Sequence, residues 1–340
     1  MSDTYRSLQA DAPGAALRLV EQPVAEPGPG QVRIAVEACG ICHSDSMILE
    51  GHLPGMAFPL TTGHEIAGRI DALGSGVEGF QPGDRVAVGW FGGNCGHCAA
   101  CREGDAINCA TLQVPGLAYP GGFADAVVVP ATALARIPDG FSSAEAAPMG
   151  CAGVTVYNAL RRSAARPGDL VAVLGIGGLG HLGVQFAQKM GFETVAIARG
   201  ADKEPLARRL GAHHYLDSTA QDVAQELRAL GGAKVVLATA TSATAATDTL
   251  GGLTHRGELV VVGVPAEPLQ IPAAQLVMGT HKVYGHASGT SREVEETLRF
   301  AALSGVRAMI EEIPLTEAAQ GLERMLTGKA RFRMVLTTGR

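Results

Sequence analysis

The most constraining feature of this sequence is a glycine-rich segment at residues 170–191. It opens with a dense apolar run around Val171 and Val173, which predicts a strand buried on both faces, as in a parallel sheet. Apolar residues spaced four apart follow the glycines and indicate one face of a helix. The order strand, tight turn, helix predicts an α/β fold with a doubly wound parallel sheet. The glycines form G-x-G-G-x-G and are Gly175, Gly177, Gly178 and Gly180.

This glycine turn predicts a dinucleotide site. The first glycine permits the bend, the second lets the backbone approach a pyrophosphate, and the third lets the helix pack closely against the strand. The phosphates then face the positive end of the helix. Glycine accounts for 45 of the 340 residues, so a chance match forming only a tight turn is the alternative. The flanking strand and helix favour nucleotide binding.

Length and charge narrow the class of protein. A chain of 340 residues has room for about two domains. A net charge of −6 without basic runs argues against nucleic acid or an anionic membrane as the main partner. Nothing near the start resembles a signal peptide, and no apolar run approaches about 18 residues. We therefore expect a cytoplasmic protein that acts on a small molecule.

The seven cysteines suggest bound metal, because an odd and clustered set in a reducing compartment favours metal ligation over disulfides. The densest group has the spacing C-x2-C-x2-C-x7-C on a glycine-rich lobe at about residues 92–112. Four thiolates complete a tetrahedral shell and leave no position for chemistry, which predicts a structural zinc site. An iron–sulfur cluster or redox-active thiols are the alternatives. The predicted ligands are Cys95, Cys98, Cys101 and Cys109.

A second metal site is suggested by Cys42 in CGICHSD and His64 in TTGHE. One thiolate and one imidazole make half of a zinc site, which Asp45 or Glu65 could orient from behind. The alternative for His64 is a hydrogen-bonded structural residue. The alternative for Cys151 is core packing at the start of a helix, but the other two residues lack a third ligand, which favours zinc.

The two halves of the chain differ in predicted secondary structure. Up to about residue 130, short strands punctuated by glycines predict a mainly β region. Beyond residue 191, strands alternate with helices, which predicts six strands of a Rossmann sheet. After residue 288, amphipathic pieces lead to a final apolar strand.

Taken together, these motifs resemble the zinc-containing alcohol dehydrogenases of the medium-chain dehydrogenase/reductase superfamily. The resemblance runs in the family's order through CGICHSD, TTGHE, the four-cysteine lobe, CAGVTVY, LGIGGLG and GKARFRMVL. It implies a GroES-like catalytic domain at residues 1–152 and 288–340, a Rossmann domain at residues 153–287, and an active site between them. It also implies a homodimer or homotetramer.

The resemblance implies roles for single residues. The ligands of a catalytic zinc would be Cys42, His64 and Cys151, with an open position for water or substrate. Glu65 resembles the carboxylate behind the metal, and Asp45 the partner of the histidine ligand. The remaining roles are a proton acceptor at Ser44, pyrophosphate contacts at His43 and Arg333, and a cofactor contact at Thr155.

One position departs from the family pattern. Many members carry a histidine shortly after the serine or threonine, which passes the proton to solvent, whereas Met47 stands here. The cofactor ribose, water and His43 are the alternative routes for a proton from Ser44. Substrate is not readable from the sequence, although Leu53 and Trp90 are candidate pocket residues, and Trp90 could equally be core.

The implied activity is reversible hydride transfer between a primary or secondary alcohol and NAD(P). The alternatives are a polyol or formaldehyde dehydrogenase of the same superfamily, and a non-catalytic protein that binds zinc and nucleotide. NAD-specific sites place a carboxylate at the end of the second strand, where this chain has Ala198. Arg199 and Lys203 could pair with a 2′-phosphate, which favours NADP and leaves NAD open. An Arg199 that points into solvent is the alternative.

Overall fold

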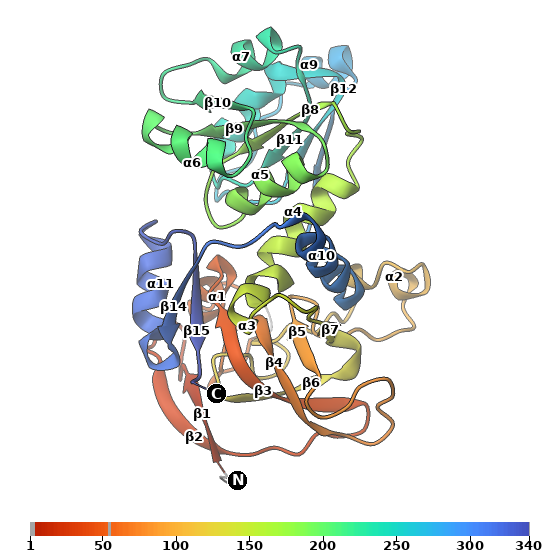
Figure 1. Cartoon of the computed structure of the whole chain (residues 1–340), viewed down its shortest axis with the longest axis vertical. Coiled ribbons are helices and arrows are strands. Elements are labelled where there is room, and N and C mark those ends of the chain that lie inside the picture. The colour runs from red at the N-terminus through yellow and green to blue at the C-terminus, as the bar shows by residue number, and fades with distance from the viewer. Residues whose placement is uncertain (1–3, 54–55, 340) are drawn as a thin grey trace. The chain divides into compact units, whose positions relative to one another are not determined.

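The computed structural model describes residues 4–53 and 56–339. The ends of the predicted first domain, residues 1–3 and 340, and residues 54–55 lie outside this description. The chain divides into two compact units, each with its own hydrophobic core (Figure 1). The first unit is Met1–Val154, Ser288–Leu303 and Ala308–Arg340, and the second is Thr155–Ala287 and Ser304–Arg307.

The first unit is built on a seven-stranded sheet in the order β14-β15-β3-β4-β5-β7, with β6 also paired to β3. All of its pairings are antiparallel except β14 with β15. A separate antiparallel pair joins β1 and β2. The strands are β1 (Thr4–Gln9), β2 (Arg18–Pro23), β3 (Gln31–Gly40), β4 (Glu65–Leu73), β5 (Arg85–Val88), β6 (Ala126–Pro130), β7 (Ala135–Arg136), β14 (Ile310–Pro314) and β15 (Arg333–Thr337).

The long strand β3 organises this unit. Its side chains alternate between the core and the opposite face, and Val32, Ile34 and Val36 are completely buried. This confirms the period-two pattern of the sequence, because successive side chains of a strand point to opposite faces. β3 pairs with β4 on one edge and with β6 and β15 on the other, so it carries the chain directly to Cys42 from the centre of the sheet.

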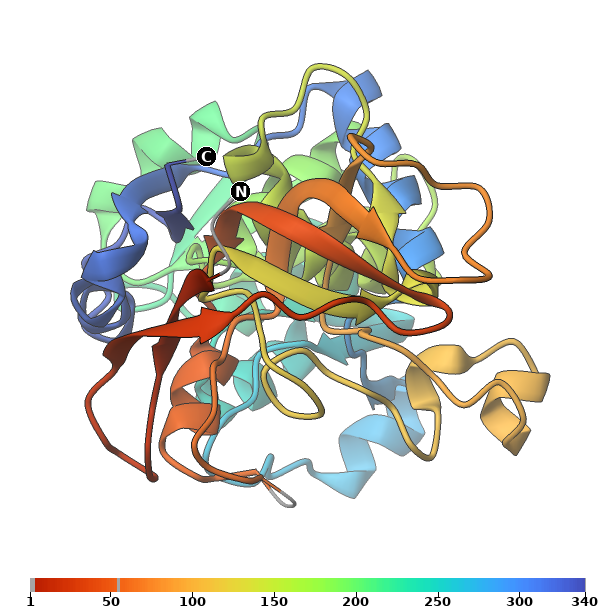
Figure 2. The same ribbon diagram turned by 90° about the horizontal axis from the view of Figure 1, so that it is seen from below.

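Short helices connect these strands. In α3 the Ser142 side chain accepts a hydrogen bond from the backbone N–H of Glu145, and the Glu145 carboxylate accepts one from the Ser142 N–H, which caps the helix. The lobe that carries α2 projects from the rest of the first unit in both views (Figure 1 and Figure 2). The helices are α1 (His43–Leu49), α2 (Ala99–Arg102), α3 (Ser143–Ala146), α10 (Ser291–Ser304) and α11 (Ala318–Leu326), and α4 (Ala152–Arg161) begins in the first unit and continues into the second.

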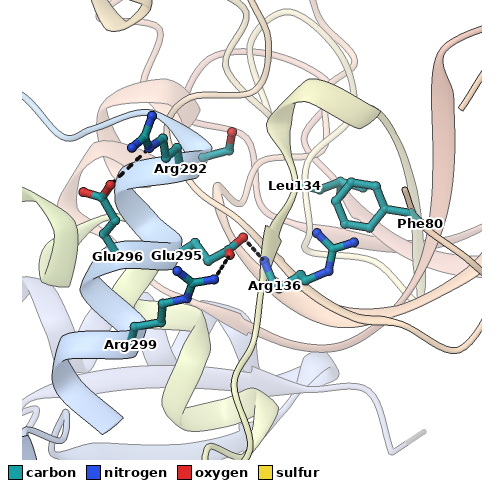
Figure 3. Close-up of a pocket in the computed structure, with 8 residues that line it drawn as sticks. Phe80, Leu134, Arg136, Arg292, Glu295, Glu296 and Arg299 are labelled. Carbon is teal, nitrogen blue, oxygen red and sulfur yellow. Dashed lines mark hydrogen bonds and ion pairs between the residues drawn. The ribbon is translucent and has the colours of Figure 1, made fainter. Parts of the chain in front are cut away.

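One face of α10 borders a small charged cavity (Figure 3). Glu295 pairs with Arg299 at 3.0 Å and accepts a hydrogen bond from the backbone N–H of Arg136, whose guanidinium lies over the ring of Phe80. Exposed pairs of this kind contribute about 0.3–0.5 kcal/mol each, so they fasten the helix weakly. The cavity is lined by Phe80, Leu134, Arg136, Ser291, Arg292, Glu295, Glu296 and Arg299.

The second unit contains a six-stranded parallel sheet in the order β10-β9-β8-β11-β12-β13, which confirms the predicted Rossmann sheet. The central strand β8 is buried at all five positions, as expected of a strand covered on both faces. The strands are β8 (Leu170–Leu174), β9 (Glu193–Ala198), β10 (His214–Asp217), β11 (Ala233–Ala238), β12 (Leu253–Val261) and β13 (Lys282–Gly285).

Helices follow the strands of this sheet, as a doubly wound fold requires. They are α5 (Gly180–Lys189), α6 (Glu204–Arg209), α7 (Val223–Ala229), α8 (Ala243–Asp248) and α9 (Ala273–Gly279). The 3-10 turns of the second unit are η4 (Ala201–Lys203) and η5 (Thr249–Gly252), and those of the first unit are η1 (Ala106–Asn108), η2 (Ala131–Ala133), η3 (Ala147–Gly150) and η6 (Leu315–Glu317), all within the described residues. None of the described helices is both long and apolar enough to cross a bilayer.

Candidate active site

Cys42 lies between the end of β3 and the start of α1. It is the residue before the helix, and its backbone N–H donates to Oδ2 of Asp45 at 2.8 Å. An acidic side chain in the first turn satisfies a free backbone donor and complements the positive end of the helix dipole. The helix therefore fixes the backbone of Cys42 and directs Asp45 inward, a local structure that the sequence did not predict.

Asp45 orients His64. The carboxylate is 0% exposed, and its Oδ1 accepts from Thr62 Oγ1 at 2.8 Å and from the backbone N–H of Gly63 at 3.2 Å. The same oxygen lies 3.2 Å from Nδ1 of His64. A carboxylate behind a ring nitrogen leaves the other nitrogen to bind a metal. In the part of the chain that the structure describes, His64 Nε2 is buried and has no hydrogen-bond partner.

Four possible ligand atoms converge at this point. One atom each from Cys42, His64, Glu65 and Cys151 lie within 4.8 Å of one another. The sulfurs of Cys42 and Cys151 are 4.0 Å apart. Two sulfurs bound tetrahedrally to one zinc ion at 2.3 Å lie about 3.8 Å apart, so the observed spacing fits zinc. The donor set of two thiolates, one imidazole and a buried carboxylate fits the same ion.

The pKa values of the two cysteines are shifted in opposite directions. The Cys151 thiol and the His64 ring hold the pKa of Cys42 well below its ordinary value, and the Cys42 thiolate raises the pKa of Cys151. Burial lowers the pKa of His64 and the Asp45 carboxylate raises it, and the resulting pKa lies above its ordinary value. Two adjacent buried thiolates repel each other, whereas a divalent cation between them stabilises both charged forms.

Glu65 is paired with Arg333. The carboxylate is 0% and the guanidinium 4% exposed, and Nη2 of Arg333 donates to Oε1 of Glu65. Burial raises the pKa of Glu65 to about 7. Burial lowers the pKa of Arg333 and the charge of Glu65 raises it, and the resulting pKa lies above its ordinary value. The structure thus places Arg333, predicted as a pyrophosphate contact, against the carboxylate beside the metal ligands.

Gly40 makes room for Glu65, a function that the sequence analysis missed. The two residues face each other in the pairing of β3 with β4, and a Cβ on Gly40 would lie 2.0 Å from Oε2 of Glu65. Only glycine permits this approach, so the glycine of CGICHSD is part of the site. The signal was present in the motif, but the strand register that gives it meaning is a tertiary feature.

Another close approach brings Cys151 into place. A Cβ on Gly89 would lie 1.9 Å from the carbonyl oxygen of Gly150, so two chain segments touch through bare backbone. Trp90, the next residue along, packs edge-on against His64 with ring centroids 5.0 Å apart. The structure therefore places Trp90 against a candidate ligand, and Leu53 packs against the hydrophobic core of the first unit.

The four-cysteine lobe forms a second cluster, in which one sulfur each from all four cysteines lie within 4.8 Å of one another. Cys109 Sγ lies 3.6 Å from Cys95 Sγ and 3.9 Å from Cys98 Sγ, again close to the spacing of a tetrahedral zinc site. The Cys98 N–H donates to Cys95 Sγ, and the Cys95 N–H to Cys109 Sγ, each at 3.4 Å. Backbone N–H groups of His97 and Cys98 lower the pKa of Cys95 to about 6, which suits a thiolate ligand.

The glycine turn has the geometry of a phosphate cradle. Gly175 has a φ of +96°, which favours glycine, and a Cβ on Gly180 would lie 1.8 Å from the carbonyl oxygen of Gly175. A Cβ on Gly177 would meet no atom within 4 Å, so this backbone faces open space. The first glycine therefore makes the bend, the last permits close packing, and the middle position is open to a ligand.

The other predicted residues lie as follows. Ser44 Oγ is 3.8 Å from Cys42 Sγ, and the Ser44 side chain is half-buried. His43 is exposed, and Thr155 is buried. Ala198 ends β9 with an exposure of 7%, Arg199 is exposed, and Lys203 Nζ donates to the carbonyl oxygen of Arg199 at 3.0 Å.

Known proteins match this arrangement over the whole chain. Residues 28–139 match the alcohol dehydrogenase GroES-like domain, and residues 178–302 match the zinc-binding dehydrogenase domain. Alcohol dehydrogenase notN of Aspergillus sp. (strain MF297-2) is 39% identical over 99% of each chain. An alcohol dehydrogenase of Geobacillus stearothermophilus is 38% identical over 90% of this chain and 92% of its own. The cinnamyl alcohol dehydrogenase SbCAD4 of Sorghum bicolor superposes with a TM-score of 0.89 at 31% identity, covering 98% of this chain and 97% of its own.

The fold, the glycine turn and the similarity to known alcohol dehydrogenases all indicate the same class of oxidoreductase. The chain belongs to the zinc-type alcohol dehydrogenases of the medium-chain dehydrogenase/reductase superfamily.

Substitution of Gly40 by alanine should disrupt the site from a position that carries no functional group. The added methyl would displace Glu65 from Arg333, and breaking a buried ion pair costs about 3–5 kcal/mol. We expect a loss of that size in the free energy of unfolding, measured by urea denaturation, together with loss of metal. Gly285→Ala is the control, because its Cβ would meet only Val261 O at 3.9 Å. Equal stability of the two variants would contradict the close approach.

Proposed function

We propose that this chain is a zinc-dependent alcohol dehydrogenase that transfers hydride reversibly between a primary or secondary alcohol and NAD(P). Cys42, His64 and Cys151 would hold a catalytic zinc, and the four-cysteine lobe a structural zinc. The observation that carries the proposal is the buried, unpartnered Nε2 of His64 among the described residues, directed at two sulfurs 4.0 Å apart. Mere nucleotide binding requires none of these groups.

A zinc ion held there would act as a Lewis acid that lowers the pKa of an alcohol hydroxyl. The chain's own residues supply the rest. Asp45 fixes the ring of His64, and Glu65 brings a carboxylate beside the ligands, balanced by Arg333. Ser44, next to Cys42, would accept the hydroxyl proton of the substrate.

The proton must then leave Ser44 without a following histidine. Met47 is half-buried at that position of α1, and its thioether does not carry a proton at neutral pH. His43, exposed at the first position of the helix, water or the cofactor ribose would take over this role. The glycine turn would bind the pyrophosphate at the N-terminus of α5.

A cytoplasmic location and a homodimeric or homotetrameric assembly belong to the same proposal. Composition supports the first, and resemblance to the family supports the second. His43, Thr155 and Arg333 stay proposed cofactor contacts on the same basis.

A substrate panel tests the proposed function. Purified protein is incubated with primary alcohols, secondary alcohols, a polyol and formaldehyde, each with NAD(H) or NADP(H), and absorbance at the nicotinamide band is followed. We expect turnover of primary or secondary alcohols, or of the corresponding aldehydes or ketones. Turnover of the polyol or formaldehyde alone would favour another member of the superfamily. Nucleotide binding without any turnover would contradict an enzymatic function.

Ser44→Ala should reduce turnover by about 10²-fold, the usual contribution of a positioned proton-transfer group. Zinc content and nucleotide affinity should stay close to those of the wild type, because Ser44 belongs to neither ligand cluster. Steady-state kinetics and metal analysis on the same preparation measure both. Ser46→Ala is the matched control on the same helix, since Ser46 Oγ donates to the carbonyl oxygen of His43. Normal turnover of Ser44→Ala would remove Ser44 from the mechanism.

We propose that NADP(H) is preferred over NAD(H). The end of β9 carries Ala198 in place of a carboxylate, and the exposed Arg199 follows it. Ala198→Asp should shift the ratio of kcat/KM values towards NAD by about tenfold or more, because a carboxylate repels a 2′-phosphate and binds a 2′-hydroxyl. Steady-state kinetics with both cofactors measure the ratio. A wild type that prefers NAD, or a variant with an unchanged ratio, would contradict this assignment.

A further inference from the structure

The loop that follows β9 is held by side chains of the neighbouring strand. In the parallel register, Asp217 at the end of β10 lies opposite Ala198 at the end of β9. Oδ1 of Asp217 accepts a hydrogen bond from the backbone N–H of Gly200 at 2.9 Å, and the hydroxyl of Tyr215 donates to the carbonyl oxygen of Gly200. Both backbone groups of Gly200 are therefore fixed by β10.

The two residues that precede Gly200 are held by hydrogen bonds too. The backbone N–H of Ser218 donates to the carbonyl oxygen of Ala198 at 3.0 Å, and Lys203 Nζ donates to the carbonyl oxygen of Arg199. Gly200 itself has a φ of +85°, a conformation that side chains rarely adopt. The backbone around Arg199 is thus held rigidly, although the Arg199 side chain is exposed.

The carboxylate of Asp217 makes its hydrogen bonds in this contact through one oxygen, Oδ1. The hydroxyl and backbone N–H of Thr219 also donate to Oδ1, at 2.7 and 2.9 Å, and these bonds with that of Gly200 hold the pKa of Asp217 below its ordinary value. The carboxylate that the second strand lacks is therefore present one strand further out. Its hydrogen bonds described above join it to Gly200 and Thr219.

We propose that Asp217 is a positioning residue for cofactor selection: by holding the N–H of Gly200, it sets the direction in which Arg199 leaves the sheet edge. This inference rests on the proposed NADP(H) preference, because it assigns to Asp217 the placement of the group that would meet the 2′-phosphate. β8, β9 and β10 are neighbours in the sheet, so their carboxyl ends share the edge at which such folds bind dinucleotides.

Two nucleotide fragments test the proposal without turnover. Adenosine 2′,5′-bisphosphate and AMP differ only in the 2′-phosphate, and their Kd values for the full-length protein are measured by titration calorimetry. In Asp217→Ala, we expect Kd for the bisphosphate to rise about tenfold, the scale of one lost hydrogen bond to a charged group. Kd for AMP should change less than about threefold, because AMP has no 2′-phosphate for Arg199 to bind. Asp217→Asn keeps the acceptor oxygen and should restore most of the affinity.

Two further variants make the result decisive. Asp222→Ala removes a comparable bond, from the backbone N–H of Gln225 to Oδ1 of Asp222 at 3.0 Å, and should leave both Kd values unchanged. If Asp217→Ala does not fold, Tyr215→Phe replaces it, with a smaller rise for the bisphosphate alone. An unchanged ratio of Kd values in the folded variant overturns the proposal, as does Asp217→Asn behaving like Asp217→Ala. The wild-type ratio separately tests the proposed NADP(H) preference, because the positioning role is judged from the change in ratio.

Discussion

Replacement of Cys42 by alanine should abolish alcohol oxidation while the fold persists. The variant loses one of two sulfurs at the cluster with His64, so the metal bound there should be lost. Lewis-acid stabilisation contributes several kcal/mol, and we expect kcat/KM to fall by about 10³-fold or more. Metal analysis should show one zinc fewer per chain, and circular dichroism should match that of the wild type.

Cys39→Ala is the matched control for this experiment. Cys39 is a buried thiol three residues before Cys42, and it belongs to neither ligand cluster. Its removal should cost about 1 kcal/mol of packing and leave both metals in place. If Cys42→Ala kept its metal and its activity, the assignment of the catalytic ligands would be wrong.

Replacement of Cys98 by alanine should instead act on stability. A structural zinc ion contributes free energy to folding, because its ligands are assembled only in the folded lobe. We expect the free energy of unfolding to fall by about 3 kcal/mol or more, with the loss of one zinc per chain. Residual activity per remaining catalytic zinc should be retained at low temperature. Thermal unfolding followed by circular dichroism measures the loss.

His97→Ala is the control for the lobe. The exposed His97 lies between two ligands in sequence, but its ring Nδ1 is 2.8 Å from the carbonyl oxygen of Cys95 and it is absent from the sulfur cluster. Its removal should leave zinc content unchanged. A Cys98→Ala protein as stable as the wild type would contradict a structural metal in this lobe.

The sequence predicted best those features that are formed by residues close together in the chain. The apolar run of β8 and the glycines after it predicted the parallel sheet, because burial on both faces and close helix packing leave local patterns. The cysteine spacing likewise predicted a cluster in the lobe, since successive ligands separated by only two to seven intervening residues meet within one loop. These features are local, and the structure shows both.

The remaining parts of the site depend on strand register and on residues far apart in the chain. Gly40 faces Glu65 only because β3 pairs with β4, and Glu65 meets Arg333, 268 residues later, only because β15 joins the same sheet. The helix α1 was not predicted, because seven residues are too few for a clear helical period. The clamp of Asp217 on Gly200 was missed for the same reason as Gly40: it arises from strand pairing.

Anomalous diffraction from crystals of the wild-type protein, recorded on both sides of the zinc absorption edge, tests the central claim most directly. We predict two zinc peaks per chain. One should lie about 2.3 Å from the sulfurs of Cys42 and Cys151 and about 2.0–2.1 Å from Nε2 of His64, the usual zinc distances. The other should lie among the four cysteines of the lobe. A single peak, or anomalous signal from iron at the lobe, would contradict the two-zinc account.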